Sequence, residues 1–129
     1  MIFKLKEEIL DENKRQESSI KSNLIILLLH MLKYKYQEEY ENKNSWINSI
    51  YNALTNIITE FTCIGKGALY KNFYMKKLNL SQLYKIARSR AARETGIDIN
   101  TFPEHCEWSK NQLIDVDFID TFLDEYQYN

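Results

Sequence analysis

The sequence predicts an all-α fold, a single bundle of about four main helices with short flanking helices. Apolar residues recur with helical spacing along the chain, and no strand-like alternation persists. Only one Pro and three Gly are present, so few residues interrupt helices. A chain of 129 residues can bury one hydrophobic core, and we expect residues 1–129 to form a single helical domain.

The first half of the chain predicts three helical segments. Residues 2–12 form a short amphipathic pattern, which polar residues 11–14 interrupt. Residues 18–39 are expected to form the central helix, because residues 24–32 are apolar around the whole circumference and such helices are normally surrounded by others. Asn44 or Ser45 can then cap a third helix that ends near Phe61. Glycines in the segment 63–67 favour a break after it.

The second half predicts a long helix over residues 68–95, with a kink or break near 77–81. Gly96 is typical of a residue that follows a helix end, and residues 97–108 should be irregular. Ser109 and Gln112 have the spacing of a capping box, so a short helix should begin there, and residues 118–126 suggest one or two final turns. The predicted core includes Leu27, Leu28, Ile50, Leu54, Phe73 and Tyr84.

Composition excludes several classes of protein. The formal net charge is −1, so no global field favours nucleic acid or membrane surfaces. The sequence has no signal-peptide pattern and no apolar run near the ~20 residues that span a bilayer, so we expect a cytoplasmic protein that does not bind membranes. Cys63 and Cys106 are interpreted as reduced thiols. Neither they nor His105 have the paired short spacings typical of zinc ligands, and we expect no metal or cofactor.

The charge is unevenly distributed. Residues 61–93 contain eight basic residues and no acidic one, whereas residues 94–129 contain nine acidic residues and one lysine. Aromatic residues interleave with the basic ones, as in proteins that bind single strands, so the 66–93 stretch is a candidate nucleic-acid site. The alternative, which we favour, is that the acidic tail, residues 115–125, lies near this stretch and neutralises part of its charge. The candidate nucleic-acid contacts are Lys71, Lys76, Lys77, Lys85, Arg88 and Arg90.

No catalytic motif occurs in the sequence, so the leading hypothesis is a non-enzymatic protein that binds another protein. His30 lies in the apolar central helix, and either hydrogen bonds within the core or faces a pocket. An enzyme with a catalytic site around His30, Glu94 and Arg88 is therefore a further alternative. Glu94 is more simply explained as an ion-pair partner of Arg90 or Lys33. Trp46 is expected in the core, whereas Trp108 is a candidate interface residue.

Four blocks in fixed order carry a resemblance to a known family. They are His30-Met31-Leu32-Lys33-Tyr34, Ser45-Trp46, Ala91-Ala92-Arg93-Glu94-Thr95-Gly96, and Phe102-Pro103-Glu104-His105-Cys106. In this order they resemble a bacterial family of unknown function, family twenty-nine of the domains of unknown function. The resemblance implies an all-helical fold and assigns no catalytic residue. The chain departs from the family pattern where Glu107 follows Cys106 in place of proline, and where residues 62–66 contain no proline.

Overall fold

The computed structural model describes the backbone of residues 2–38, 41–62 and 67–127, and the side chains of residues 14–38, 41–62 and 71–127. These residues form helices and contain no strand, which confirms the predicted all-α fold. In chain order the elements are α1 (Ile2–Tyr36), α2 (Lys43–Thr62), α3 (Gly67–Lys77), α4 (Leu80–Thr95), the 3-10 turn η1 (Ile99–Thr101), α5 (Lys110–Leu113) and α6 (Val116–Glu125).

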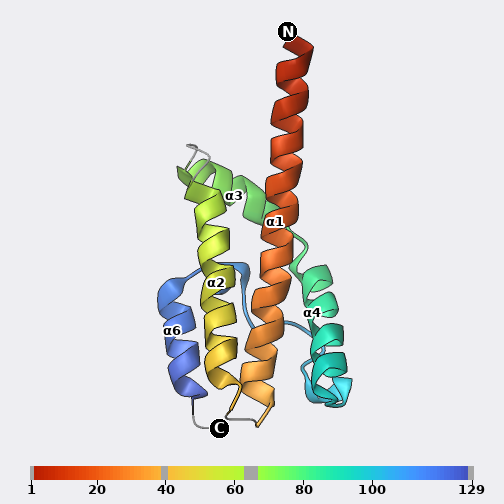
Figure 1. Cartoon of the computed structure of the whole chain (residues 1–129), viewed down its shortest axis with the longest axis vertical. Coiled ribbons are helices and arrows are strands. Elements are labelled where there is room, and N and C mark those ends of the chain that lie inside the picture. Colours follow the sequence, from red (N-terminus) through yellow and green to blue (C-terminus); the bar gives the residue numbers. More distant parts are fainter. Residues whose placement is uncertain (1, 39–40, 63–66, 128–129) are drawn as a thin grey trace.

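The bundle is built around α1 (Figure 1). α2 packs along one side of α1 and α4 along the other, and α6 lies beside α2. α3 crosses the bundle next to the end of α2, and the N-terminal part of α1 extends beyond the other helices. The predicted central helix, residues 18–39, is confirmed over residues 18–36, since α1 ends at Tyr36.

The predicted interruption of the first helix at residues 11–14 is wrong, because α1 continues unbroken from Ile2 to Tyr36. The polar run in this segment contains neither glycine nor proline. Charged and amide side chains remove the apolar face of a helix, but they leave its backbone hydrogen bonds intact. A gap in the apolar pattern is therefore weaker evidence for a helix end than a residue that blocks the backbone.

The predicted break near residues 77–81 is confirmed. α3 ends at Lys77, and the Asn79 side chain caps α4 by accepting a hydrogen bond from the backbone N–H of Gln82 at 3.2 Å. This break explains why the predicted burial of Phe73 is wrong. One continuous helix would align Phe73 with Leu80 and Tyr84. Because α3 is a separate helix, it packs through a different face, and Tyr74, Met75 and Leu78 are buried instead. The Phe73 side chain is 61% exposed.

The C-terminal part of the chain follows the predicted signals. Gly96 has a φ of 75° and its N–H bonds to the carbonyl of Ala92, as expected after a helix end. The capping box of Ser109 and Gln112 is present and starts α5. The final helix is longer than predicted, because the Asp115 side chain caps α6 by accepting from the N–H groups of Asp117 and Phe118. The predicted break at 63–67 falls largely on residues 63–66, which lie outside the described residues.

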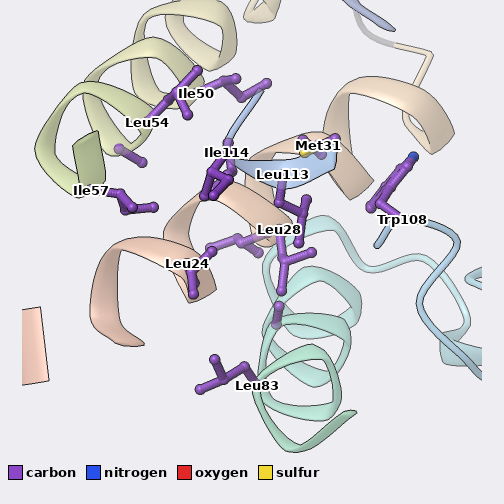
Figure 2. Packing of buried hydrophobic residues seen from close by; sticks show 14 of the residues in the cluster. Leu24, Leu28, Met31, Ile50, Leu54, Ile57, Leu83, Trp108, Leu113 and Ile114 are labelled. Atoms are coloured by element: carbon purple, nitrogen blue, oxygen red, sulfur yellow. The ribbon is translucent and has the colours of Figure 1, made fainter. Parts of the chain in front are cut away.

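One cluster of buried side chains holds these helices together (Figure 2). Leu24, Leu28 and Met31 from α1 meet Ile50 and Leu54 from α2, as Figure 2 shows. Leu83 of α4 and the C-terminal residues Trp108, Leu113 and Ile114 complete the labelled part of the cluster. Burial of Leu27, Leu28, Ile50, Leu54 and Tyr84 is confirmed.

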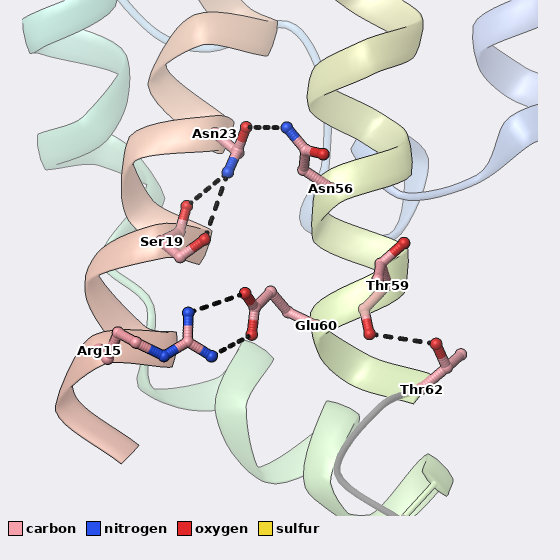
Figure 3. A network of polar contacts seen from close by, with 7 residues as sticks. All are labelled: Arg15, Ser19, Asn23, Asn56, Thr59, Glu60 and Thr62. Atoms are coloured by element: carbon pink, nitrogen blue, oxygen red, sulfur yellow. Dashed lines mark hydrogen bonds and ion pairs between the residues drawn. The ribbon is translucent and has the colours of Figure 1, made fainter. Parts of the chain in front are cut away.

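A polar network joins α1 to α2 on the outside of the bundle (Figure 3). The guanidinium of Arg15 faces the carboxylate of Glu60, with Nη1–Oε1 and Nη2–Oε2 distances of 3.3 and 3.4 Å. The Asn56 amide donates to the Asn23 side-chain oxygen at 3.1 Å. Partly exposed pairs of this kind contribute about 0–1 kcal/mol each, so they align the helices while the apolar cluster supplies most of the stability.

Candidate functional site

Two of the three residues predicted for a catalytic site, His30 on α1 and Glu94 on α4, interact electrostatically where these two helices pack together. The Nζ atom of Lys33 lies 3.3 Å from the Glu94 carboxylate, and Nε of Arg90 lies 3.6 Å from its other oxygen. The predicted pairing of Glu94 with these cations is therefore confirmed. His30 is half-buried, and its Nδ1 lies 2.8 Å from the carbonyl oxygen of Ile26, so the neutral ring donates from Nδ1.

The third predicted residue, Arg88, lies on a different face of α4 from Glu94. At ~100° per residue, Arg88 and Glu94 lie about 120° apart around α4. The Arg88 guanidinium donates to the carbonyl of Phe102, with Nε and Nη2 distances of 3.3 and 3.1 Å. It also lines a cleft of about 530 Å³ with residues 100–104. Glu94 therefore acts electrostatically on His30, whereas Arg88 bonds to the Phe102 carbonyl, and a catalytic role for the three stays a prediction.

The pKa of His30 should control one component of the pH dependence of stability. Burial lowers this pKa below its ordinary value of 6.5, while the Ile26 carbonyl acts in the opposite direction. The folded protein then binds this proton less readily than the unfolded chain. The contribution of His30 to the free energy of unfolding should be fully present above about pH 6.5. It should be lost as the pH decreases toward the lower pKa of the folded protein. An NMR titration of the imidazole should give a midpoint below 6.5.

A His30→Gln variant provides the control for this prediction, because its side chain does not titrate. The His30 imidazole signal should be missing from its NMR spectrum, which identifies that signal in the wild-type protein. Denaturant unfolding of the variant should also lack the loss of stability that protonation of His30 causes at low pH. A midpoint above 6.5 in the wild-type protein would contradict the dominance of burial.

The predicted nucleic-acid contacts are divided among several surfaces. The side chains of Lys71, Lys76, Lys77 and Lys85 are exposed, but Arg88 and Arg90 are half-buried and bonded within the chain. Lys71 and Lys76 line one cleft and Lys77 lines another. The six cations therefore belong to separate surfaces of α3 and α4. Nucleic-acid binding stays a prediction.

The expected contact between the acidic tail and the basic stretch is wrong. α6 lies beside α2, whereas α4 lies on the other side of α1 (Figure 1). The hydroxyls of Tyr34 and Tyr51 donate to the carbonyl of Leu123 and the carboxylate of Asp120, which ties α6 to α1 and α2. Within the described ranges no ion pair joins α6 to α3 or α4. The apolar side of α6 determines its position, since Ile119, Phe122 and Leu123 are buried in the core.

The predicted roles of the two tryptophans can be compared with their burial. Trp46 is buried in the core, as expected. Trp108 is buried as well, and its ring contacts Phe122 edge-on at a centroid distance of 5.5 Å. This position makes Trp108 a packing residue of the bundle, and its role at an interface with a partner stays a prediction.

Cys106 is half-buried in the loop that precedes α5. Its thiol donates to the carbonyl of Trp108 at 3.3 Å, and burial raises the pKa of this thiol. Cys106 is not disulfide-bonded, while Cys63 lies outside the described residues. In the part of the chain that the structure describes, no three His, Cys, Asp or Glu side chains gather as metal ligands would.

A groove between α1 and the start of α4 was not identified from the sequence. It has a volume of about 400 Å³, within the range of ligand sites. Its apolar surface comes from Ile25, Leu83 and Ile86, and Ile86 is 42% exposed. The remaining lining residues are polar, and none of them is acidic. These polar residues are Lys21, Lys77, Asn79 and Gln82.

The fold and these surfaces define a small helical-bundle protein without a recognisable catalytic constellation among its described residues. The chain matches the family model described as the domain of unknown function DUF29 over residues 2–119, and it belongs to that family. No curated protein and no solved structure matches the chain. None of the helices in the described residues has the length and apolar character that crossing a membrane requires.

Proposed function

We propose that this protein is a non-enzymatic helical module that binds an acidic amphipathic helix of another protein in the groove between α1 and α4. The observation that supports this proposal is a groove whose lining combines apolar residues with two lysines and contains no acidic residue. Single exposed apolar residues are common on proteins, but Ile86 lies in a concave surface beside Ile25 and Leu83.

The charge of the groove favours an acidic partner. Lys77 is exposed, and its ammonium lies 5.2 Å from the centroid of the Phe73 ring. Lys21 lies 3.1 Å from Glu17 on the same helix, an exposed pair that a partner carboxylate can replace at small cost. An amphipathic helix with an apolar stripe and flanking glutamates can place apolar side chains over Ile86 and carboxylates near both lysines. This complementarity predicts faster association at low salt.

The proposal can be tested by fluorescence anisotropy with a labelled amphipathic peptide that carries leucines on one helical face and glutamates on the other. We expect the wild-type protein to bind this peptide and to bind a lysine-substituted version much more weakly. Ile86→Asp should weaken binding by about tenfold or more, because it removes apolar contact and places a negative charge beside the glutamates.

Val116→Asp is the matched control. Val116 is 45% exposed, close to the 42% of Ile86, but it lies on α6. This variant should bind the peptide as the wild-type protein does. Equal loss of binding in both variants, or equal affinity for the glutamate and lysine peptides, would contradict the proposed groove. Absence of any binding by the folded wild-type protein would contradict it as well.

A further inference from the structure

A second concave surface lies between α3 and the start of α5, apart from the groove discussed above. Its volume is about 500 Å³. α3 contributes Lys71, Asn72, Met75 and Lys76, and the C-terminal segment contributes Ser109, Lys110 and Asn111. Three of the seven lining residues are lysines and none is acidic. The other polar residues carry amide or hydroxyl groups that donate hydrogen bonds.

The position of Lys110 is fixed by the chain itself. Its Nζ atom donates to the carbonyl oxygen of Met75 at 2.7 Å, and its side chain is partly buried. This bond holds the start of α5 against the end of α3 and places a positive charge in the cleft. An ammonium group has three donors, so two remain for a ligand. Lys71 and Lys76 are exposed, and within the described residues no carboxylate pairs with any of the three lysines.

Three positive charges around one cleft repel one another unless an anion lies between them. We propose that this cleft binds linked phosphate groups, as in a triphosphate or another multiply charged phosphate ester. Lysine binds phosphate as a compact point charge, and the nearby amide and hydroxyl donors suit phosphate oxygens. The cleft is lined by residues different from those of the peptide groove, so this site does not depend on the function proposed above.

The test is a titration of the ¹⁵N-labelled full chain with inorganic tripolyphosphate, followed by NMR and by calorimetry. We expect the backbone amide signals of Asn72 and Asn111 to shift, and the affinity to decrease as salt is added. The double variant Lys71→Gln with Lys76→Gln should weaken binding by about tenfold or more. Lys110 is left unchanged in this variant because its bond to Met75 supports the fold.

The double variant Lys85→Gln with Arg93→Gln is the matched control, because it also removes two exposed positive charges of the basic stretch, and neither residue lines the cleft. It should bind tripolyphosphate as the wild-type protein does. Equal weakening in this control and in the Lys71→Gln, Lys76→Gln variant would overturn the proposal, since it would indicate attraction by overall charge alone. Absence of binding, or signal shifts that avoid Asn72 and Asn111, would also overturn it.

A second arm of the experiment distinguishes the source of the phosphates. An oligothymidine is titrated in parallel, with Phe73→Ala as an added variant, because the exposed Phe73 ring follows Asn72 on α3 and can stack on a base. Oligothymidine binding that depends on both the lysines and Phe73 would support the phosphate site and assign it to a single-stranded nucleic acid. Tripolyphosphate binding with no dependence on Phe73 would support a small phosphate ligand.

Discussion

Replacing Leu28 with alanine should lower the free energy of unfolding by about 2–5 kcal/mol, because it leaves a cavity at the centre of the bundle. Leu28 is 0% exposed. Figure 2 shows its side chain among residues of α1, α4 and the C-terminal segment, so the surrounding helices cannot close the cavity without moving. Denaturant unfolding followed by circular dichroism gives the difference directly.

The matched control for Leu28→Ala is Ser22→Ala, also on α1. Ser22 is exposed, and its replacement should change the free energy of unfolding by no more than about 0.5 kcal/mol. Unfolding of Leu28→Ala within about 0.5 kcal/mol of the wild-type protein would contradict the placement of residues 24–32 at the centre of the fold.

Predictions from the sequence succeeded where a local signal determines the local structure. The capping box of Ser109 and the glycine at position 96 each satisfy backbone groups within a few residues, so their effects can be predicted without the rest of the fold. The segment 11–14 shows the limit of pattern reading. A polar run removes packing partners but does not stop the helix, and only the structure distinguishes the two.

Burial was harder to predict because it depends on how helices cross. Phe73 fits an apolar stripe that continues to Leu80 and Tyr84, but the break at residues 78–79 ends that stripe. The acidic tail was misplaced for a similar reason. Charge alone favoured a position near α3 and α4, whereas burial of Phe122 and its neighbours places α6 beside α2. Apolar burial contributes more than exposed ion pairs, so it determines where an amphipathic helix packs.

The candidate surfaces could not be predicted from the sequence because each combines distant residues. The peptide groove joins Lys21 to Ile86, and the lysine cleft joins Lys71 to Lys110. Lys110 is the one lysine in the otherwise acidic segment 94–129, and its partner is a backbone carbonyl of α3 that carries no sequence signal.

The pairing of Glu94 with Arg90 could be predicted, since those residues lie one helical turn apart.

The match to the family model ends at residue 119, but the core of this chain continues beyond it. Phe122 is 4% exposed, and its ring lies 5.9 Å from Tyr34, 5.5 Å from Trp108 and 5.2 Å from Tyr126, measured between centroids. These contacts join α6 to α1 and to the loop before α5. The last turns of α6 are therefore part of the folded unit in this protein.

Phe122→Ala should consequently lower the free energy of unfolding by about 3–5 kcal/mol. This loss is large for a single core substitution, because the three contacts with aromatic rings are lost together. Phe122→Leu should recover part of this loss, since leucine refills most of the volume, and Thr121→Ala on the exposed side of α6 should have little effect. Denaturant unfolding of the three variants measures these differences. If Phe122→Ala and Thr121→Ala were equally stable, α6 would be a peripheral helix and the core would end where the family match ends.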